Sequence, residues 1–105
     1  MRLVIPPECQ IGARTYRIVY NDWLLDKLGL RANCSSKDQK IYLHTGLTAI
    51  ANFEDLAHEL THIASWTSAH EIDEATIKGV SNILTQALLS LGIEPDFSQI
   101  PKEKL

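Results

Sequence analysis

Two stretches in the second half of the chain carry apolar side chains at helical spacing, and they constrain the fold more than any other feature. Between about residues 48 and 66, apolar residues recur every three or four positions, which places them on one stripe of an α-helix. The pattern returns between about residues 70 and 91, and Gly92 and Pro95 then end it. The stripes contain Phe53, Leu56, Ala57, Leu60, Ile63 and Ala64 in the first stretch, and Ile77, Val80, Ile83, Leu84, Ala87, Leu88 and Leu91 in the second. The sequence therefore predicts two long amphipathic helices whose stripes face the core.

The first half of the chain is typical of strands instead. Residues 15–20 are rich in β-forming side chains, and residues 40–44 alternate apolar and polar side chains with period two. Between them, Asn21 precedes a short apolar segment that Gly29 ends, which predicts a short helix. Residues 33–40 are polar and turn-like. This order predicts an α+β fold, with a small antiparallel or mixed sheet packed against the two long helices.

The length and composition fit one domain. The chain has 105 residues, of which 45% are hydrophobic, and typical domains contain about 100–150 residues. We expect a single domain over residues 1–105, with residues 1–14 as an N-terminal arm or edge strand and residues 94–105 as a polar surface tail. No apolar run approaches the roughly 18 residues of a membrane span, and the start lacks the apolar stretch of a secretory signal. A cytoplasmic location without a membrane partner is therefore expected.

The charge balance and the cysteine count exclude further classes. Thirteen acidic and ten basic residues give a formal net charge of −3. A chain with this net charge is not expected to neutralise many backbone phosphates, so no nucleic-acid partner is expected. The two cysteines, Cys9 and Cys34, show neither a disulfide framework nor the paired spacing of a metal site.

The segment His58-Glu59-Leu60-Thr61-His62 is an H-E-x-x-H sequence inside the first predicted helix. Residues four apart lie on the same helix face, so the two imidazoles can bind one metal ion, at about 2.0–2.1 Å for zinc. Glu59 lies on the flank, where its carboxylate can reach a water molecule that the metal activates. Both histidines lie opposite the apolar stripe, and packing against the core therefore does not account for them.

A catalytic zinc site usually takes a third protein ligand and keeps one coordination position for water. The candidates on or before the second predicted helix are His70, Glu71, Asp73 and Glu74. The three carboxylates also suit a helix N-terminus electrostatically. The residues alone therefore leave the third ligand open.

The chain resembles the minimal gluzincins and the related ImmA/IrrE-like and phage-encoded small metallopeptidases. In these proteins a short sheet and an edge strand precede the H-E-x-x-H helix, and a second helix supplies a glutamate ligand. Small or apolar residues typically follow that glutamate at +3, +6, +7 and +10. From Glu74 these positions hold Ile77, Val80, Ser81 and Leu84, whereas the same positions after Glu71 fit badly.

The resemblance implies a zincin-like fold and one zinc ion per chain, bound by His58, His62 and Glu74. Asp73 and Glu71 remain the alternative third ligands. Residues 39–44 look like the edge strand that lines the cleft in these proteins and pairs with an extended peptide.

The expected activity is zinc-dependent hydrolysis of a peptide bond in a peptide or protein substrate, with Glu59 as general base. Tyr42, His44 and His70 are candidates by side-chain type for contacts with the oxyanion or the substrate. So short a chain has few residues left to form a second subdomain for substrate recognition. A further hypothesis is therefore that the enzyme acts with, or on, one dedicated partner protein. The alternatives are a metal-stabilised interaction module without catalysis and an α+β binding domain without metal.

Overall fold

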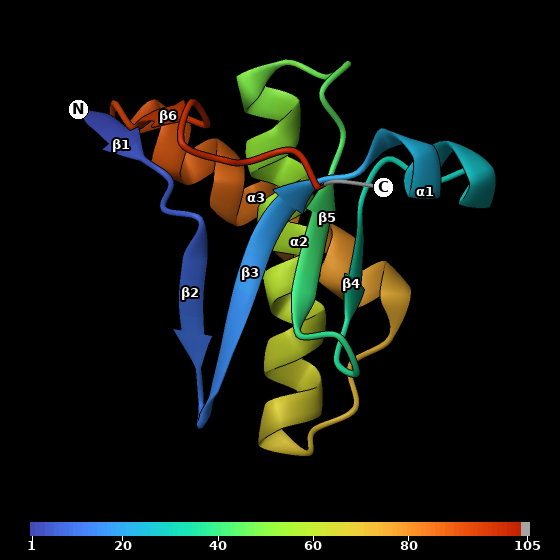
Figure 1. The fold of residues 1–105 in the computed structure, drawn as a ribbon. Helices are drawn as coiled ribbons and strands as arrows, with labels where there is room; N and C mark the ends of the chain where they lie inside the picture. Colours follow the sequence, from blue (N-terminus) through green and yellow to red (C-terminus); the bar gives the residue numbers. More distant parts are fainter. Residues whose placement is uncertain (104–105) are drawn as a thin grey trace.

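A four-stranded sheet forms one layer of the molecule, and two long helices lie behind it (Figure 1). This computed structural model describes residues 1–103. The elements in chain order are β1 (Arg2–Val4), β2 (Glu8–Ile11), β3 (Arg14–Tyr20), α1 (Asp22–Leu28), β4 (Asn33–Ser35), β5 (Lys40–Leu43), α2 (Ala49–Ser68), α3 (Glu74–Ser90) and β6 (Glu94–Asp96). The predicted α+β class is therefore confirmed.

The four-stranded sheet is mixed and has the order β2-β3-β5-β4. β2 and β3 form an antiparallel hairpin, β3 and β5 are parallel, and β4 and β5 are antiparallel. Gly12 lies in the hairpin turn with a φ of 61°, and a Cβ atom there would come within 2.9 Å of the Thr67 side chain on α2. A glycine is therefore needed both for the turn and for its close approach to the helix.

The prediction that residues 39–44 form the edge strand is wrong. β5 lies inside the sheet, and the edge beside it is β4. The expected turn over residues 33–40 begins with this strand, in which Asn33 pairs with Tyr42 and Cys34 pairs with Ile41. Its three residues have no strong strand pattern of their own, so pairing with β5 and packing of Cys34 against the core stabilise the strand.

The main core lies between the sheet and α2. Tyr16 and Ile18 of β3 and Ile41 and Leu43 of β5 face the helix, where Phe53, Leu56 and Ile63 are buried against them. Thr48 caps the start of α2, because its side chain accepts a hydrogen bond from the Ala51 N–H. The first apolar stripe therefore packs on the sheet, although Ala64 at its end is exposed.

The prediction that the apolar stripe of the second helix faces the core holds only for part of the stripe, since Ile77 is buried and Leu88 packs against the main core. α3 packs on α2 through Ile77, Ser81 and Thr85, which are at most 1% exposed. Thr85 Oγ1 donates to the Ser81 carbonyl at 2.7 Å, and Ser81 Oγ donates to the Lys78 carbonyl at 3.3 Å. Burial of these hydroxyls therefore leaves no unpaired donor, and small side chains let the two helices approach closely. Val80, Ile83 and Leu84 of α3 and Leu91, the residue that follows it, remain exposed to solvent.

The prediction of a polar surface tail over residues 94–105 is wrong for its described part. β6 pairs with β1 in a parallel two-stranded sheet. Phe97 and Ile100 are each only 7% exposed and belong to the main core. Glu103 then accepts hydrogen bonds from Lys40 and from Asn21, which holds the segment against β3 and β5. Two apolar residues among polar neighbours are thus enough to anchor this segment.

The N-terminal residues divide between two sheets. β1 pairs with β6, and β2 is an edge strand of the four-stranded sheet. The expected edge strand within residues 1–14 is therefore present as β2, next to the predicted strand over residues 15–20. Within residues 1–103, no helix is both long and apolar enough to cross a membrane.

The anchoring of the C-terminal segment can be tested by its effect on the free energy of unfolding. We expect Phe97→Ala to lower the free energy of unfolding by about 3 kcal/mol or more, because it removes a buried aromatic ring from the main core. Ile50→Ala, at a position that is 53% exposed, should change the free energy by less than about 0.5 kcal/mol. Urea denaturation of both variants checks this, and equal stability of the two would contradict the packing of Phe97.

Candidate metal centre

The two histidines of the H-E-x-x-H sequence project from the same face of α2. Their ring centroids are 4.9 Å apart, and the two Nε2 atoms approach to 3.2 Å. Each side chain is about one quarter exposed, at 22% for His58 and 24% for His62. The four-residue spacing on one helix therefore brings both ring nitrogens to a single point at the surface.

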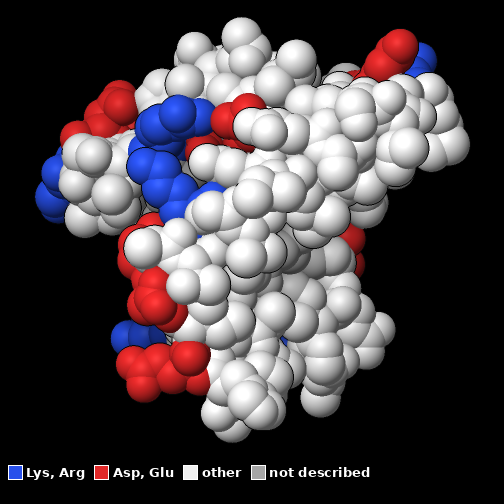
Figure 2. Space-filling model, turned by 180° about the vertical axis from the view of Figure 1, so that it is seen from behind, with Lys and Arg blue, Asp and Glu red and all other residues white. Residues whose placement is uncertain are grey.

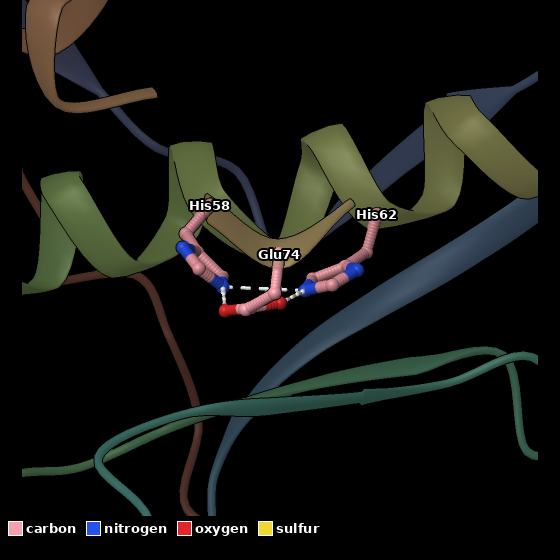
Figure 3. A group of neighbouring side chains, drawn as sticks. All are labelled: His58, His62 and Glu74. Carbon is pink, nitrogen blue, oxygen red and sulfur yellow. Dashed lines mark hydrogen bonds and ion pairs between the residues drawn. The ribbon is translucent and has the colours of Figure 1, made fainter. Parts of the chain in front are cut away.

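Glu74, the first residue of α3, places its carboxylate between the two imidazoles (Figure 3). Its Oε1 lies 2.9 Å from His58 Nε2, and its Oε2 lies 2.8 Å from His62 Nε2. Glu74 lies one turn before Ile77 and two turns before Ser81, on the side of α3 that packs on α2. The candidate ligand Glu74 thus lies on the same face of α3 as the residues that pack on α2.

The loop between α2 and α3 determines where α3 begins. α2 ends at Ser68, and Ala69, which caps its C-terminus, has a left-handed φ of 57°. Ser65, buried on α2, donates its hydroxyl to the His70 carbonyl at 2.6 Å and accepts the Ile72 N–H at 3.1 Å. One side chain therefore ties two backbone groups of the loop to α2, just ahead of Glu74.

The donor set fits a zinc ion. His58, His62 and Glu74 each offer one ligand atom within 4.8 Å of the others, and no other such group was found within residues 1–103. Ligands at about 2.0–2.2 Å around a tetrahedral zinc are roughly 3.3 Å apart. The separations of 2.8–3.2 Å are close to that value. Two imidazoles and one carboxylate are also a known catalytic donor set, with a fourth position left for water.

Glu59 lies next to this cluster, in the wall of a groove that also includes His58 and Glu74. It is 7% exposed, and the Cys34 thiol of β4 is its hydrogen-bonding neighbour. Burial raises the pKa of the Glu59 carboxyl, and the Cys34 thiol and the two histidines offset part of this rise. The Cys34 thiol has a raised pKa in turn, mainly through burial.

The two other carboxylates considered as third ligands have different places. Asp73 caps α3, since its Oδ1 accepts the Thr76 N–H at 2.8 Å, and this hydrogen bonding lowers the pKa of its carboxyl. Glu71 lines a hollow beside His62, together with Trp66 and Ile72. The structure thus brings Glu74, and neither Asp73 nor Glu71, into the cluster with the histidines.

The three candidates for substrate contacts are not brought into this cluster. Tyr42 packs with Val19 and Leu25 in a separate apolar cluster, whereas its neighbours Ile41 and Leu43 belong to the main core. His44 Nε2 lies 2.9 Å from Asp26 Oδ1 of α1, and its Nδ1 accepts the Gly46 N–H. The ring of His70 is exposed, with Nδ1 2.8 Å from the Ser68 carbonyl oxygen.

A groove opens beside His58, and charged side chains line much of it. Its wall includes Arg31, Glu54, Asp55, Glu59, Glu74 and Lys78. Arg31 pairs with Asp55 at 3.2 Å. Burial raises the pKa of the Asp55 carboxyl, and Arg31 opposes that rise. A hollow on the other side of the histidines is more apolar, with Trp66, Ala69 and Ile72 in its wall. The cluster therefore stands between two open surfaces of different polarity.

Sequence reasoning missed two residues of this centre, Ser65 and Cys34. Ser65 follows His62 by three residues and so lies near it on the helix, but a serine at that spacing carries no signal by itself. Cys34 reaches Glu59 only because β4 pairs with β5 in front of α2. No local pattern in the sequence could have indicated that contact.

Comparison of the chain with protein-family models, with curated proteins and with solved structures finds no match. The geometry of the cluster is therefore what bears on function.

The ligand set is testable by metal binding. We expect the wild-type chain to bind one zinc ion, and Glu74→Gln to weaken binding by more than about 100-fold, since even partners of metal ligands contribute 10- to 100-fold. Glu71→Gln removes the same charge three residues earlier and should leave the affinity unchanged. Calorimetric titration measures the zinc affinity of all three chains. If Glu71→Gln weakened zinc binding and Glu74→Gln did not, Glu74 would be excluded as the ligand.

Ser65 provides a second test of the same centre. We expect Ser65→Ala to weaken zinc binding by about 10-fold, because the loop that positions Glu74 loses two hydrogen bonds. Ser68→Ala is the matched control, since the Ser68 hydroxyl only donates to the Ser65 carbonyl, at 3.3 Å. Equal zinc affinities for the two variants would show that Ser65 does not position Glu74.

Proposed function

We propose that this protein is a zinc-dependent peptidase that hydrolyses a peptide bond by means of activated water. The observation that carries the proposal is the cluster of His58, His62 and Glu74 with the buried carboxylate of Glu59 beside it. A zincin-like arrangement, in which the second helix supplies the third ligand, forms part of this proposal. So does a cytoplasmic location.

Zinc bound at this centre would act as a Lewis acid, polarising the substrate carbonyl and making water acidic enough to react near pH 7. Glu59 takes a proton from the attacking water and delivers it to the leaving amine. Its carboxyl suits this exchange because burial raises its pKa, which makes it a better proton acceptor than an exposed glutamate. The Cys34 thiol orients the carboxylate from the side of β4.

The donor set favours catalysis over the alternative of a purely structural metal. Structural zinc sites almost always have four protein ligands, whereas catalytic sites have three and one open position. The cluster has three, and Glu74 is 65% exposed. The groove beside His58 also leaves room for a ligand next to the centre.

The substrate in this proposal is an extended peptide that pairs with β4. This strand is the end of the sheet order, so its outer edge has no partner strand among the described elements. An extended chain there would hydrogen-bond to β4 and pass in front of Glu59, whose neighbour Cys34 is on the same strand. One dedicated protein substrate remains the narrower form of this hypothesis.

Glu59→Gln tests the mechanism. The amide cannot accept the proton from water, and we expect peptide hydrolysis by the zinc-loaded protein to fall by about 10²- to 10⁴-fold while zinc affinity stays unchanged. Hydrolysis is followed by mass spectrometry on a mixture of unstructured peptides. Glu54→Gln is the control, because Glu54 lines the same groove on the same helix and should keep the wild-type rate.

Removal of zinc separates catalysis from a structural role. In the proposed enzyme the core between α2 and the sheet does not involve the ligands, so the zinc-free chain should still unfold cooperatively, with a lower Tm. Hydrolysis that persists in Glu59→Gln would refute the proposed mechanism. A wild-type chain that binds zinc, hydrolyses nothing and unfolds when zinc is removed would instead support the metal-stabilised interaction module.

A further inference from the structure

We propose that α3 is the interface of a homodimer in which two copies of this chain pair their α3 helices antiparallel. The proposal concerns the flank of α3 that faces neither α2 nor the groove beside His58. It is independent of the metal centre and of the proposed activity.

The flank of α3 in question is an exposed row of apolar side chains. Val80 is 53% exposed, Leu84 is 52% exposed and Leu91 is 79% exposed, and Ala87 between them is exposed as well. We call these four residues the α3 seam. Ile83, at 69% exposure, lies beside it. Contiguous apolar surface of this kind in a folded protein marks an interaction site more often than chance exposure does.

The spacing of the α3 seam is that of a helix–helix interface. Its four residues are separated by four, three and four positions, which is the repeat of core positions in paired helices. The seam lies about 100° around the helix axis from the side that packs on α2. α3 therefore has two distinct packing surfaces, of which α2 covers one.

The absence of charged residues makes the α3 seam compatible with a second copy of itself. No Asp, Glu, Lys or Arg occurs between Lys78 and Glu94. Figure 2 shows the side of the molecule on which α3 lies. Charged side chains gather mainly along its left side and at its upper right corner, and a broad surface without charge lies between them. Two copies can therefore meet here without bringing like charges together.

The order of side-chain sizes also fits self-pairing. In an antiparallel pair about a two-fold axis between Leu84 and Ala87, the large Leu84 of one chain faces the small Ala87 of the other. Val80 likewise faces Leu91 of the other chain. Each contact occurs twice, as a two-fold interface requires, and the small Ala87 leaves room for the large Leu84 as in well-packed cores.

Sedimentation velocity over about 1 µM to 1 mM tests the proposal, a range that covers weak to moderate association. The wild-type chain should change from monomer to dimer with concentration. Leu84→Glu should remain monomeric throughout the range, because it buries a charge against an apolar partner. Leu28→Glu, an equally exposed leucine on α1 (49%), is the matched control and should dimerise like the wild type.

A mixing experiment tests the antiparallel register. Ala87→Lys alone should also be monomeric, and it serves as the second variant if Leu84→Glu does not fold. Mixed in equal amounts, the Leu84→Glu and Ala87→Lys chains should form a heterodimer, because position 84 of one faces position 87 of the other. A wild-type chain that is monomeric at every concentration overturns the proposal. Dimers of Leu84→Glu, or failure of the mixture to associate, overturn it equally.

Discussion

The close contact between α2 and α3 is the interaction on which the geometry of the candidate metal centre depends. It is made by Ile77 and by the hydroxyl side chains of Ser81 and Thr85, and both hydroxyls donate to carbonyls of their own helix. Because these side chains are small and satisfied, the helices approach closely without leaving unpaired polar groups. The same contact aligns Glu74 with His58 and His62 at one end of α3 and turns the aliphatic residues of α3 outward.

The candidate metal centre combines a rigid pair of potential ligands with a positioned third one. His58 and His62 are held by one helix, so their separation follows from helical geometry alone. Glu74 comes from another helix, and its place depends on where the loop after α2 ends. Ser65 fixes that loop through two hydrogen bonds. The site thus gathers donors from two helices, while the buried Glu59 and its neighbour Cys34 link it to the edge of the sheet.

The two ends of the chain complete the fold through contacts between distant residues. β1 and β6 pair with one another, and Phe97 and Ile100 enter the main core. Glu103 joins β3 and β5 through Asn21 and Lys40. Segments that look polar and peripheral in sequence therefore contribute to burial, which matters in a chain of 105 residues with a small core.

The sequence by itself determined the elements whose signals are local. The period of apolar residues located α2, Asn21 and Gly29 delimited α1, and the four-residue spacing of His58 and His62 placed both rings on one face. Only the tertiary structure decided which flank of α3 is buried, that Glu74 rather than Asp73 or Glu71 meets the histidines, and that β4 rather than β5 is the edge strand. Apolar character cannot identify a packing face when small hydroxyl residues permit closer contact than leucines do, and strand order depends on partners distant in the chain.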